Sequence, residues 1–194
     1  MVVVLKLGIQ KDNQLFALLN KLDCQYKLSR NEEDILSADK LILCIEKDLK
    51  SILRNLHIYN LFSLLRLIKK PILTIGTGVQ LLYDRLLDNS SAGLGILNLP
   101  DNIDNSIRLT DMECGLEIKV LKKERLFDGF GNTTQFYFNK ITYIPLTDDT
   151  TAIAEKKHEC CVAIEKSNYY GVQFHPELSG DSGEKLLRNF LEKC

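Results

Sequence analysis

The segment Pro71–Leu82, PILTIGTGVQLL, places an apolar run directly before two closely spaced glycines and a second apolar pattern. Its first part, Pro71–Ile75, has the β-branched content of a strand that is buried on both faces. Gly76 and Gly78 predict a tight turn, and Val79–Leu87 then shows helical spacing. A strand, a sharp turn and a helix in this order form the repeating unit of a doubly wound α/β fold.

The same alternation runs through the residues that precede this segment. Apolar runs predict buried strands at Val2–Leu7 and Lys40–Ile45, and Cys24–Leu28 is a candidate short strand. Helical spacing covers Lys11–Leu22 and returns from Leu49 to Lys69. We therefore expect a parallel sheet with helices on both faces.

The second half of the chain has a different character. After the polar stretch Asn98–Asn105, Gly and Asn separate short apolar pieces, which is typical of antiparallel strands. The predicted strands are Leu116–Leu121, Gln135–Phe138, Ile141–Ile144, Thr151–Ala154, Cys161–Glu165 and Tyr170–Phe174. A helical pattern at Asp181–Lys193, capped by Asp181 or Ser182, ends the chain. We predict one domain over residues 1–194, with a mostly parallel central sheet and an antiparallel C-terminal extension.

The composition excludes several classes of function. The chain has 194 residues, 45% of them hydrophobic, and a net charge of -1, so no electrostatic argument favours nucleic acid or an anionic membrane as a partner. No apolar run reaches the roughly 18 residues that span a bilayer. Met1–Gly8 is predicted to be a buried strand rather than a targeting signal. A cytoplasmic protein is expected.

The thiols suggest neither a disulfide framework nor a metal site. The six cysteines form no C-x-x-C pair, and the chain has three histidines. Free thiols in a reducing compartment are the simplest interpretation. No metal and no cofactor are predicted.

The glycine turn has the position of a nucleophile elbow but lacks a nucleophile. An elbow needs small residues on either side of a strained central residue, and here Thr74 and Gly78 flank Gly76. Glycine has no side chain that could attack a carbonyl. Two other interpretations stay open: a turn whose backbone N–H groups bind phosphate, and a tight βα turn without a ligand. Leu81 replaces the third glycine of the dinucleotide fingerprint.

A second motif, Gly171–Glu177 (GVQFHPE), ends a predicted strand with a histidine. Pro176 stops the strand and holds His175 extended. His175 and Glu177 stand two residues apart around this bend, so the carboxylate is expected to orient the imidazole as a general base. The alternative is a polar pair at a strand end with no role.

The string GVQFHPE, followed by Ser-Gly and a helix ending in NF, resembles the class I, triad-type glutamine amidotransferases. The resemblance covers the whole chain and is strongest to the glutaminase subunits of imidazole glycerol phosphate synthases. PILTIGTGVQLL is similar to the elbow region of this family, and GLGILNL resembles the segment that follows it.

The resemblance implies a chemistry and a partner. In the family a cysteine thiolate attacks the glutamine amide, a histidine activates the cysteine, a glutamate orients the histidine, and backbone N–H groups hold the oxyanion. The released ammonia passes to a (β/α)8-barrel synthase subunit. His175 and Glu177 match the base and the orienting residue, whereas Gly76 falls on the nucleophile position.

The sequence departs from the family pattern at other places too. The glycine-rich oxyanion segment is replaced by Cys44–Lys47, and the first glycine-rich loop by Gly8–Lys11. The partner-facing P-H-M-G-W-N segment corresponds to Thr110–Gly115, with only Met112 kept, and Y-F-V-H-S-Y is reduced to Tyr137–Lys140. The resemblance therefore implies the family's fold and base, without its nucleophile or its oxyanion loop.

Few residues could replace the missing thiol. Cys44 is expected at the carboxyl end of a central strand, on the sheet edge that carries Gly76 and His175, where it is either a displaced nucleophile or a buried structural thiol. Thr77 is expected to cap or pack the following helix. We expect Cys160 and Cys161 to fill a strand and Cys194 to fray. His57 and His158 are expected at the surface.

Three functions follow from these observations. The first is an amidotransferase subunit of a synthase complex, in the histidine-biosynthesis type of the family or in a related sugar-aminating pair, that cannot hydrolyse glutamine. The second is a regulatory or binding protein that holds glutamine or another small polar ligand at Gly76, Thr77, Gly78 and Gln80. The third is an active glutaminase that uses Cys44.

Overall fold

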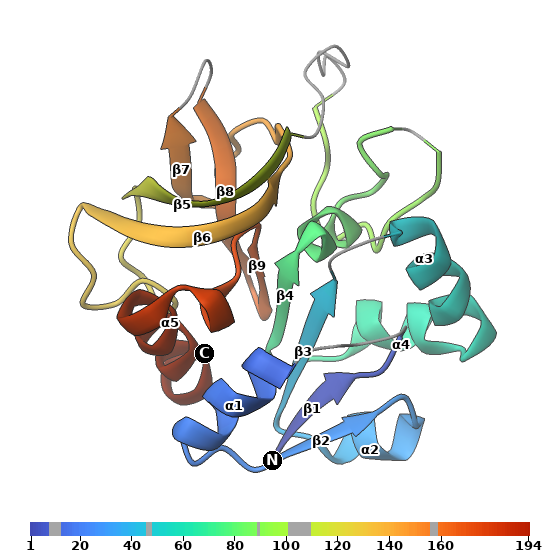
Figure 1. Ribbon diagram of the computed structural model, residues 1–194. Helices are drawn as coiled ribbons and strands as arrows, with labels where there is room; N and C mark the ends of the chain where they lie inside the picture. Colours follow the sequence, from blue (N-terminus) through green and yellow to red (C-terminus); the bar gives the residue numbers. More distant parts are fainter. Residues whose placement is uncertain (8–12, 46–47, 89, 101–109, 156–158) are drawn as a thin grey trace.

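One sheet organises the part of the chain that the structure describes. The structure is a computed structural model and describes residues 1–7, 13–45, 48–88, 90–100, 110–155 and 159–194, with the backbone alone described at 110–113. Within these ranges nine strands form a single sheet in the order β2-β1-β3-β4-β9-β8-β7-β5-β6 (Figure 1). The predicted fold class, a parallel core with an antiparallel C-terminal addition, is confirmed.

The parallel half contains five strands. In spatial order they are β2 (Tyr26–Ser29), β1 (Val2–Leu5), β3 (Lys40–Ile45), β4 (Ile72–Gly76) and β9 (Tyr169–Val172). Each coincides with a predicted strand, and its ends lie within two residues of the predicted ones. Four of them, β1, β3, β4 and β9, are almost wholly buried, because helices cover both faces of the sheet.

The antiparallel half contains the other four strands, β8 (Glu159–Lys166), β7 (Thr150–Glu155), β5 (Thr110–Val120) and β6 (Thr133–Ile141). Two corrections to the sequence-based expectation arise here. Strand β5 starts before Leu116, and the predicted pieces Gln135–Phe138 and Ile141–Ile144 are replaced by one strand that ends at Ile141. The polar residues Asn139 and Lys140 stay in this strand because β5 pairs along it, with Asp111 opposite Lys140.

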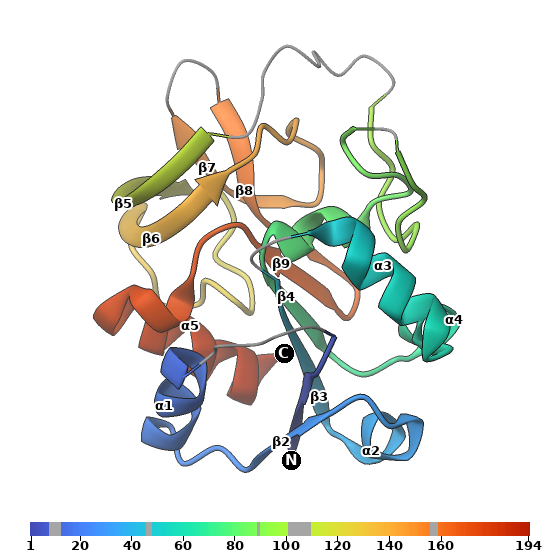
Figure 2. The same cartoon turned by 45° about the vertical axis from the view of Figure 1, so that its right-hand side comes forward.

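The helices form a layer on each face of the sheet (Figures 1 and 2). Helices α1 (Asn13–Lys21) and α5 (Gly180–Lys193) contribute Leu15, Leu186 and Phe190 to the core on one face. Helices α2 (Glu32–Ser37), α3 (Leu49–Ile58) and α4 (Leu61–Leu67) contribute to the core on the other face. The strand pleat sorts β3 between the two cores: Ile42 and Cys44 face the α1/α5 side, and Leu43 faces the α3/α4 side.

Two predicted helices differ from the structure. The long pattern Leu49–Lys69 is divided at Asn60, whose φ of 56° places it in the left-handed region that asparagine tolerates. The predicted helix Val79–Leu87 is wrong: a short 3₁₀ helix, η1 (Thr77–Leu82), replaces it. After η1 the chain folds back on itself, and a Cβ on Gly93 would lie 2.2 Å from the carbonyl oxygen of Tyr83. Burial on both sides, rather than helical amphipathicity, explains the apolar pattern there.

Smaller differences concern helix starts. Helix α2 was not predicted; the side chain of Asn31 caps it by accepting a hydrogen bond from the backbone N–H of Glu33. Helix α5 begins after Ser179 rather than at a cap formed by Asp181 or Ser182. Of the polar stretch Asn98–Asn105, residues 101–105 lie outside the described part of the chain.

A search of the described helices for a transmembrane span found none with enough length and apolar character to cross a bilayer.

Candidate functional site

The carboxyl ends of three neighbouring strands meet at one edge of the sheet. Strand β3 pairs with β4 so that Ile45 lies opposite Gly76, and β4 pairs with β9 so that Ile75 lies opposite Val172. Ligand and catalytic sites of open α/β sheets lie at this edge. The two motifs that the sequence singled out are therefore brought together.

His175 is held in a buried position just after β9. Its residue exposure is 1%, and its backbone N–H donates to the carbonyl oxygen of Tyr137 on β6 at 2.8 Å. The hydroxyl of Ser179 donates to the carbonyl oxygen of His175 at 2.6 Å and accepts from the N–H of Tyr137 at 2.9 Å. One serine thus connects the His175 segment, β6 and the start of α5.

Glu177 reaches His175 because Pro176 starts a single 3₁₀ turn, η2 (Pro176–Leu178). This turn brings Glu177 Oε1 to 2.8 Å from His175 Nδ1, and the two side chains are 6% and 2% exposed. The expected contact between the carboxylate and the imidazole is present. A carboxylate at Nδ1 selects the tautomer with its proton there, which leaves Nε2 as the acceptor nitrogen.

Gly76 has the backbone geometry of a strained strand-to-helix turn. Its φ is 70° and its ψ is -136°, in the positive-φ range that favours glycine. A Cβ built on Gly76 would lie 3.2 Å from Cε1 and 3.3 Å from Nε2 of His175. The same atom would lie 2.7 Å from the carbonyl oxygen of Ile45. A side chain at this position would therefore touch the face of the imidazole that carries Nε2, but none is present.

The three other expected ligand-binding residues are engaged with the protein. Thr77 does not cap η1; its hydroxyl donates to the carbonyl oxygen of Ile45 at 2.9 Å. Gly78 is buried against the side chain of Ile45, where a Cβ would lie 3.3 Å from Cδ1. Gln80 is 6% exposed, and its amide nitrogen donates to the hydroxyl of Thr142 at 3.5 Å.

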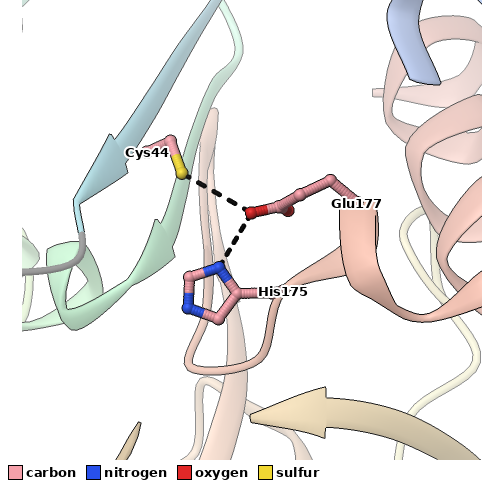
Figure 3. A group of neighbouring side chains, drawn as sticks. All are labelled: Cys44, His175 and Glu177. Atoms are coloured by element: carbon pink, nitrogen blue, oxygen red, sulfur yellow. Dashed lines mark hydrogen bonds and ion pairs between the residues drawn. The ribbon is translucent and has the colours of Figure 1, made fainter. Parts of the chain in front are cut away.

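Cys44, near the end of β3, lies beside the carboxylate rather than beside the imidazole. Its Sγ is 3.7 Å from Glu177 Oε1, and the residue is 7% exposed. Figure 3 shows the carboxylate oxygen between the sulfur and the ring nitrogen. One ligand-type atom from each of Cys44, His175 and Glu177 lies within 4.8 Å of the others.

The segments that depart from the family pattern are only partly described. In Cys44–Lys47, residues 46–47 lie outside the described part of the chain, as does the whole of residues 8–11. The two altered partner-facing segments, residues 110–115 and 137–140, lie on the paired strands β5 and β6, with Gly115 opposite Tyr137. They therefore form one continuous edge of the sheet.

The remaining thiols and histidines lie apart from this cluster. Cys160 and Cys161 are buried in β8, as expected, and burial raises the pKa of the Cys161 thiol to about 12. The expected fraying of Cys194 is wrong: its carbonyl oxygen accepts a hydrogen bond from Lys40, and burial raises the pKa of its thiol to about 11. His57 is exposed and stacks on Phe62, and His158 lies outside the described residues.

Sequence reasoning missed two residues that support the site. Gln173 is 3% exposed and cross-links strands: its amide nitrogen donates to the carbonyl oxygens of Thr142 and Cys161, and its Oε1 accepts from the N–H of Thr142. Ser179 makes the contacts described above. A glutamine in an otherwise apolar buried strand was a signal for the first, whereas the sequence contained no comparable signal for the second.

A cavity of about 290 Å³ lies elsewhere. Met1, Asp39 and Lys40 line it, so it opens at the amino ends of the parallel strands. It is not the candidate site.

Comparison with known proteins places this geometry in context. A family model described as "Glutamine amidotransferase class-I" matches residues 3–194. The imidazole glycerol phosphate synthase subunit HisH of Escherichia coli K12 is 32% identical over 194 residues, covering 98% of each chain. HisH of Vibrio cholerae is 30% identical over 198 residues, again covering 98% of each chain.

Solved structures share the fold. A GMP synthase protein of Thermoplasma acidophilum superposes with a TM-score of 0.71 at 18% identity, covering 98% of this chain and 91% of the other. A glutamine amidotransferase of Thermotoga maritima superposes with a TM-score of 0.63 at 12% identity, covering 99% and 96%. At these identities the likeness concerns the fold alone.

Proposed function

The chain belongs to the class I glutamine amidotransferase family, and from that premise we propose that it is the amidotransferase-type subunit of an imidazole glycerol phosphate synthase-like complex, unable to hydrolyse glutamine. The proposal takes residues 1–194 as one cytoplasmic domain. It keeps His175 and Glu177 in the positions of the base and its orienting carboxylate, with Gly76 in place of the nucleophile.

The observation that carries the proposal is the position of Gly76 relative to His175. The ring faces the turn with Nε2, the nitrogen that would accept a proton from a nucleophile. A Cβ at residue 76 would already be in contact with that ring. Because glycine supplies no thiol, the covalent route by which a nucleophile attacks the glutamine amide is absent at this position. Groups that act together in catalysis lose most of their effect together, so the remaining pair would contribute little alone.

Cys44 is a poor replacement on geometric grounds. Its sulfur lies against Glu177 Oε1 at 3.7 Å, so a thiolate there would face a carboxylate. Activation of a thiol needs a nearby positive charge or base, and like charges oppose it. In the elbow arrangement the imidazole stands between nucleophile and carboxylate, whereas here the carboxylate stands between thiol and imidazole (Figure 3).

The proposed partner is a (β/α)8-barrel synthase subunit. The names of the matching relatives support a synthase of the imidazole glycerol phosphate type, and a sugar-aminating synthase is the alternative within the same scheme. Strand β6 offers a physical connection to the site, because Tyr137 accepts the backbone hydrogen bond of His175. The changed residues on β5 and β6 imply a partner surface that has changed with them.

The test is intact-mass spectrometry after incubation with a diazoketone analogue of glutamine, which alkylates an active amidotransferase thiol. E. coli HisH serves as the positive control, and each protein is treated with and without its barrel subunit. We expect an adduct on E. coli HisH and none on this chain. An adduct that peptide mapping assigns to Cys44 would contradict the proposal and identify an active glutaminase with a displaced nucleophile.

A further inference from the structure

Three side chains of different chemistry converge under the end of β3. Cys44 comes from that strand, and His175 and Glu177 come from the segment after β9. All are shielded from solvent: Cys44 is 7% exposed, and the side chains of His175 and Glu177 are 2% and 6% exposed. A sulfur, an imidazole nitrogen and a carboxylate oxygen lie within 4.8 Å of one another.

Thiolate, imidazole and carboxylate are the three ligand types that Zn²⁺ binds in proteins. With bonds of about 2.3 Å to sulfur and about 2.0 Å to nitrogen and oxygen, a tetrahedral ion separates sulfur from oxygen by about 3.5 Å and nitrogen from oxygen by about 3.3 Å. The observed separations are 3.7 Å between Cys44 Sγ and Glu177 Oε1 and 2.8 Å between His175 Nδ1 and the same oxygen. The second pair needs to open by only about half an ångström, and a hydrogen-bond proton now holds it closed.

The other carboxylate oxygen is a separate observation that points to a ligand. Glu177 Oε2 is buried and has no hydrogen-bond partner among the described residues. A buried acceptor without a partner costs free energy unless a cation or another donor satisfies it. A cation bound to Glu177 would also remove the repulsion between the carboxylate and a deprotonated Cys44.

We propose that Cys44, His175 and Glu177 bind one divalent zinc-type cation, with three protein ligands and one position left open. The inference goes beyond the proposed function and needs no glutamine chemistry. The sequence could not indicate it, because residues 44 and 175 are far apart in the chain and no metal-ligand spacing joins them. Binding releases the thiol proton and the proton between imidazole and carboxylate, so affinity falls as pH falls.

The experiment is a titration of the full chain, stripped with a chelator, with Co²⁺ and then Zn²⁺. Cobalt reports a thiolate ligand through a near-ultraviolet charge-transfer band, and its visible bands report tetrahedral coordination. We expect one equivalent of Co²⁺ to bind with both sets of bands, and Zn²⁺ to displace it. Cys44→Ser should lose the charge-transfer band and weaken binding by more than about 100-fold, since even residues behind the ligands matter by 10–100-fold.

Cys114→Ser is the matched control, because Cys114 is an exposed thiol away from the cluster. It should titrate like the unmodified chain. Absence of the charge-transfer band in the unmodified chain, or its persistence in Cys44→Ser, would overturn the inference. Since a variant could misfold, a second measurement uses the unmodified chain: Zn²⁺ should slow alkylation of Cys44 by iodoacetamide and leave that of Cys114 unchanged. Equal rates at Cys44 with and without Zn²⁺ would also overturn it.

The outcomes separate this inference from the proposed function. No cobalt band together with no glutamine-analogue adduct removes the metal site and leaves the glutaminase-dead subunit standing. A cobalt band together with an adduct at Cys44 keeps the metal site and removes the proposed loss of activity.

Discussion

The ends of two adjacent parallel strands, β4 and β9, meet different fates in this molecule. After β9, His175 and Glu177 are present, buried and hydrogen-bonded to each other. After β4, the turn at Gly76 keeps a strained backbone with φ of 70° but offers no side chain. One strand end thus retains the chemistry of a triad, and the other retains only the geometry.

The contacts around each strand end explain how such a difference can persist. The β4 turn is positioned by packing and backbone contacts, such as the Thr77 hydroxyl on the Ile45 carbonyl and Gly78 against the Ile45 side chain. None of these needs a thiol at residue 76. The β9 end is held by side chains, since Ser179 bonds to the His175 carbonyl and Glu177 to the ring. Losing the nucleophile therefore leaves the fold intact.

The comparison is broken most directly by restoring a thiol, with Gly76→Cys. We expect a glutamine-analogue adduct at residue 76 where the unmodified chain forms none, because the new Cβ lies 3.3 Å from His175 Nε2. Adding His175→Asn should slow alkylation by about 100-fold, the scale of general-base catalysis. Intact-mass kinetics measure both effects.

Gly76→Ala is the matched control, since it adds the same Cβ and the same positive-φ strain without a nucleophile. Each variant should lose about 1–3 kcal/mol of unfolding free energy. An unreactive Gly76→Cys that unfolds at the same denaturant concentration as Gly76→Ala would show that the elbow no longer aims at His175.

The β9 end should be the more sensitive of the two to packing from α5. A Cβ on Gly183 would lie 1.8 Å from the carbonyl oxygen of Pro176, so Gly183→Ala must displace the turn that carries Glu177. We expect a loss of about 3 kcal/mol in urea unfolding, at the upper end of overpacking effects.

Gly180→Ala separates this overpacking from backbone strain. Nothing lies within 4 Å of its Cβ position, and its φ of 55° alone should cost about 1 kcal/mol. Equal losses in the two variants would contradict the tight packing of α5 on Pro176.

Ser179→Ala tests the hydrogen bonds that support His175. It removes the donor to the His175 carbonyl and the acceptor for the Tyr137 N–H, so we expect a loss of about 1–2 kcal/mol. Ser182→Ala, which removes only the contact with Thr134, is the control and should change stability by no more than about 0.5 kcal/mol. Urea unfolding measures both, and a larger effect in Ser182→Ala would reverse this assignment.

The smallest effect concerns a second buried carboxylate, Glu165, which has no imidazole partner. Burial raises its pKa above the ordinary value, against the opposing hydrogen bond from the Leu126 N–H and the charge of Arg125. The folded state therefore holds its proton more tightly than the unfolded state. Its contribution to stability is present below the unfolded pKa and is lost as pH rises through the raised folded pKa.

Urea unfolding at several pH values checks this sign. Glu165→Gln should lose the fall in stability that accompanies rising pH in the acidic range. Glu184→Gln supplies the opposite case, because hydrogen bonds from Lys21 and Arg188 lower the pKa of Glu184, so its contribution is lost as pH falls. A pH profile unchanged by Glu165→Gln would contradict the assignment.

Local pattern was enough to predict much of the molecule. Continuous apolar runs marked the buried strands such as Lys40–Ile45, because a doubly covered strand must be apolar along its length. The string GVQFHPE predicted the contact between His175 and Glu177, since a proline turn joins residues two apart. The empty nucleophile position was also visible, because an absent side chain needs no coordinates.

Only the tertiary structure decided what depends on register and packing between distant segments. It joined Gln135–Phe138 to the residues that follow in one strand, because β5 pairs along the whole length. It placed Cys44 against Glu177 instead of His175, and it fastened Cys194 through Lys40. Periodicity reports which face of an element is buried, but not which side chain from another element meets it there. That meeting is set by sheet register and helix packing over the whole chain.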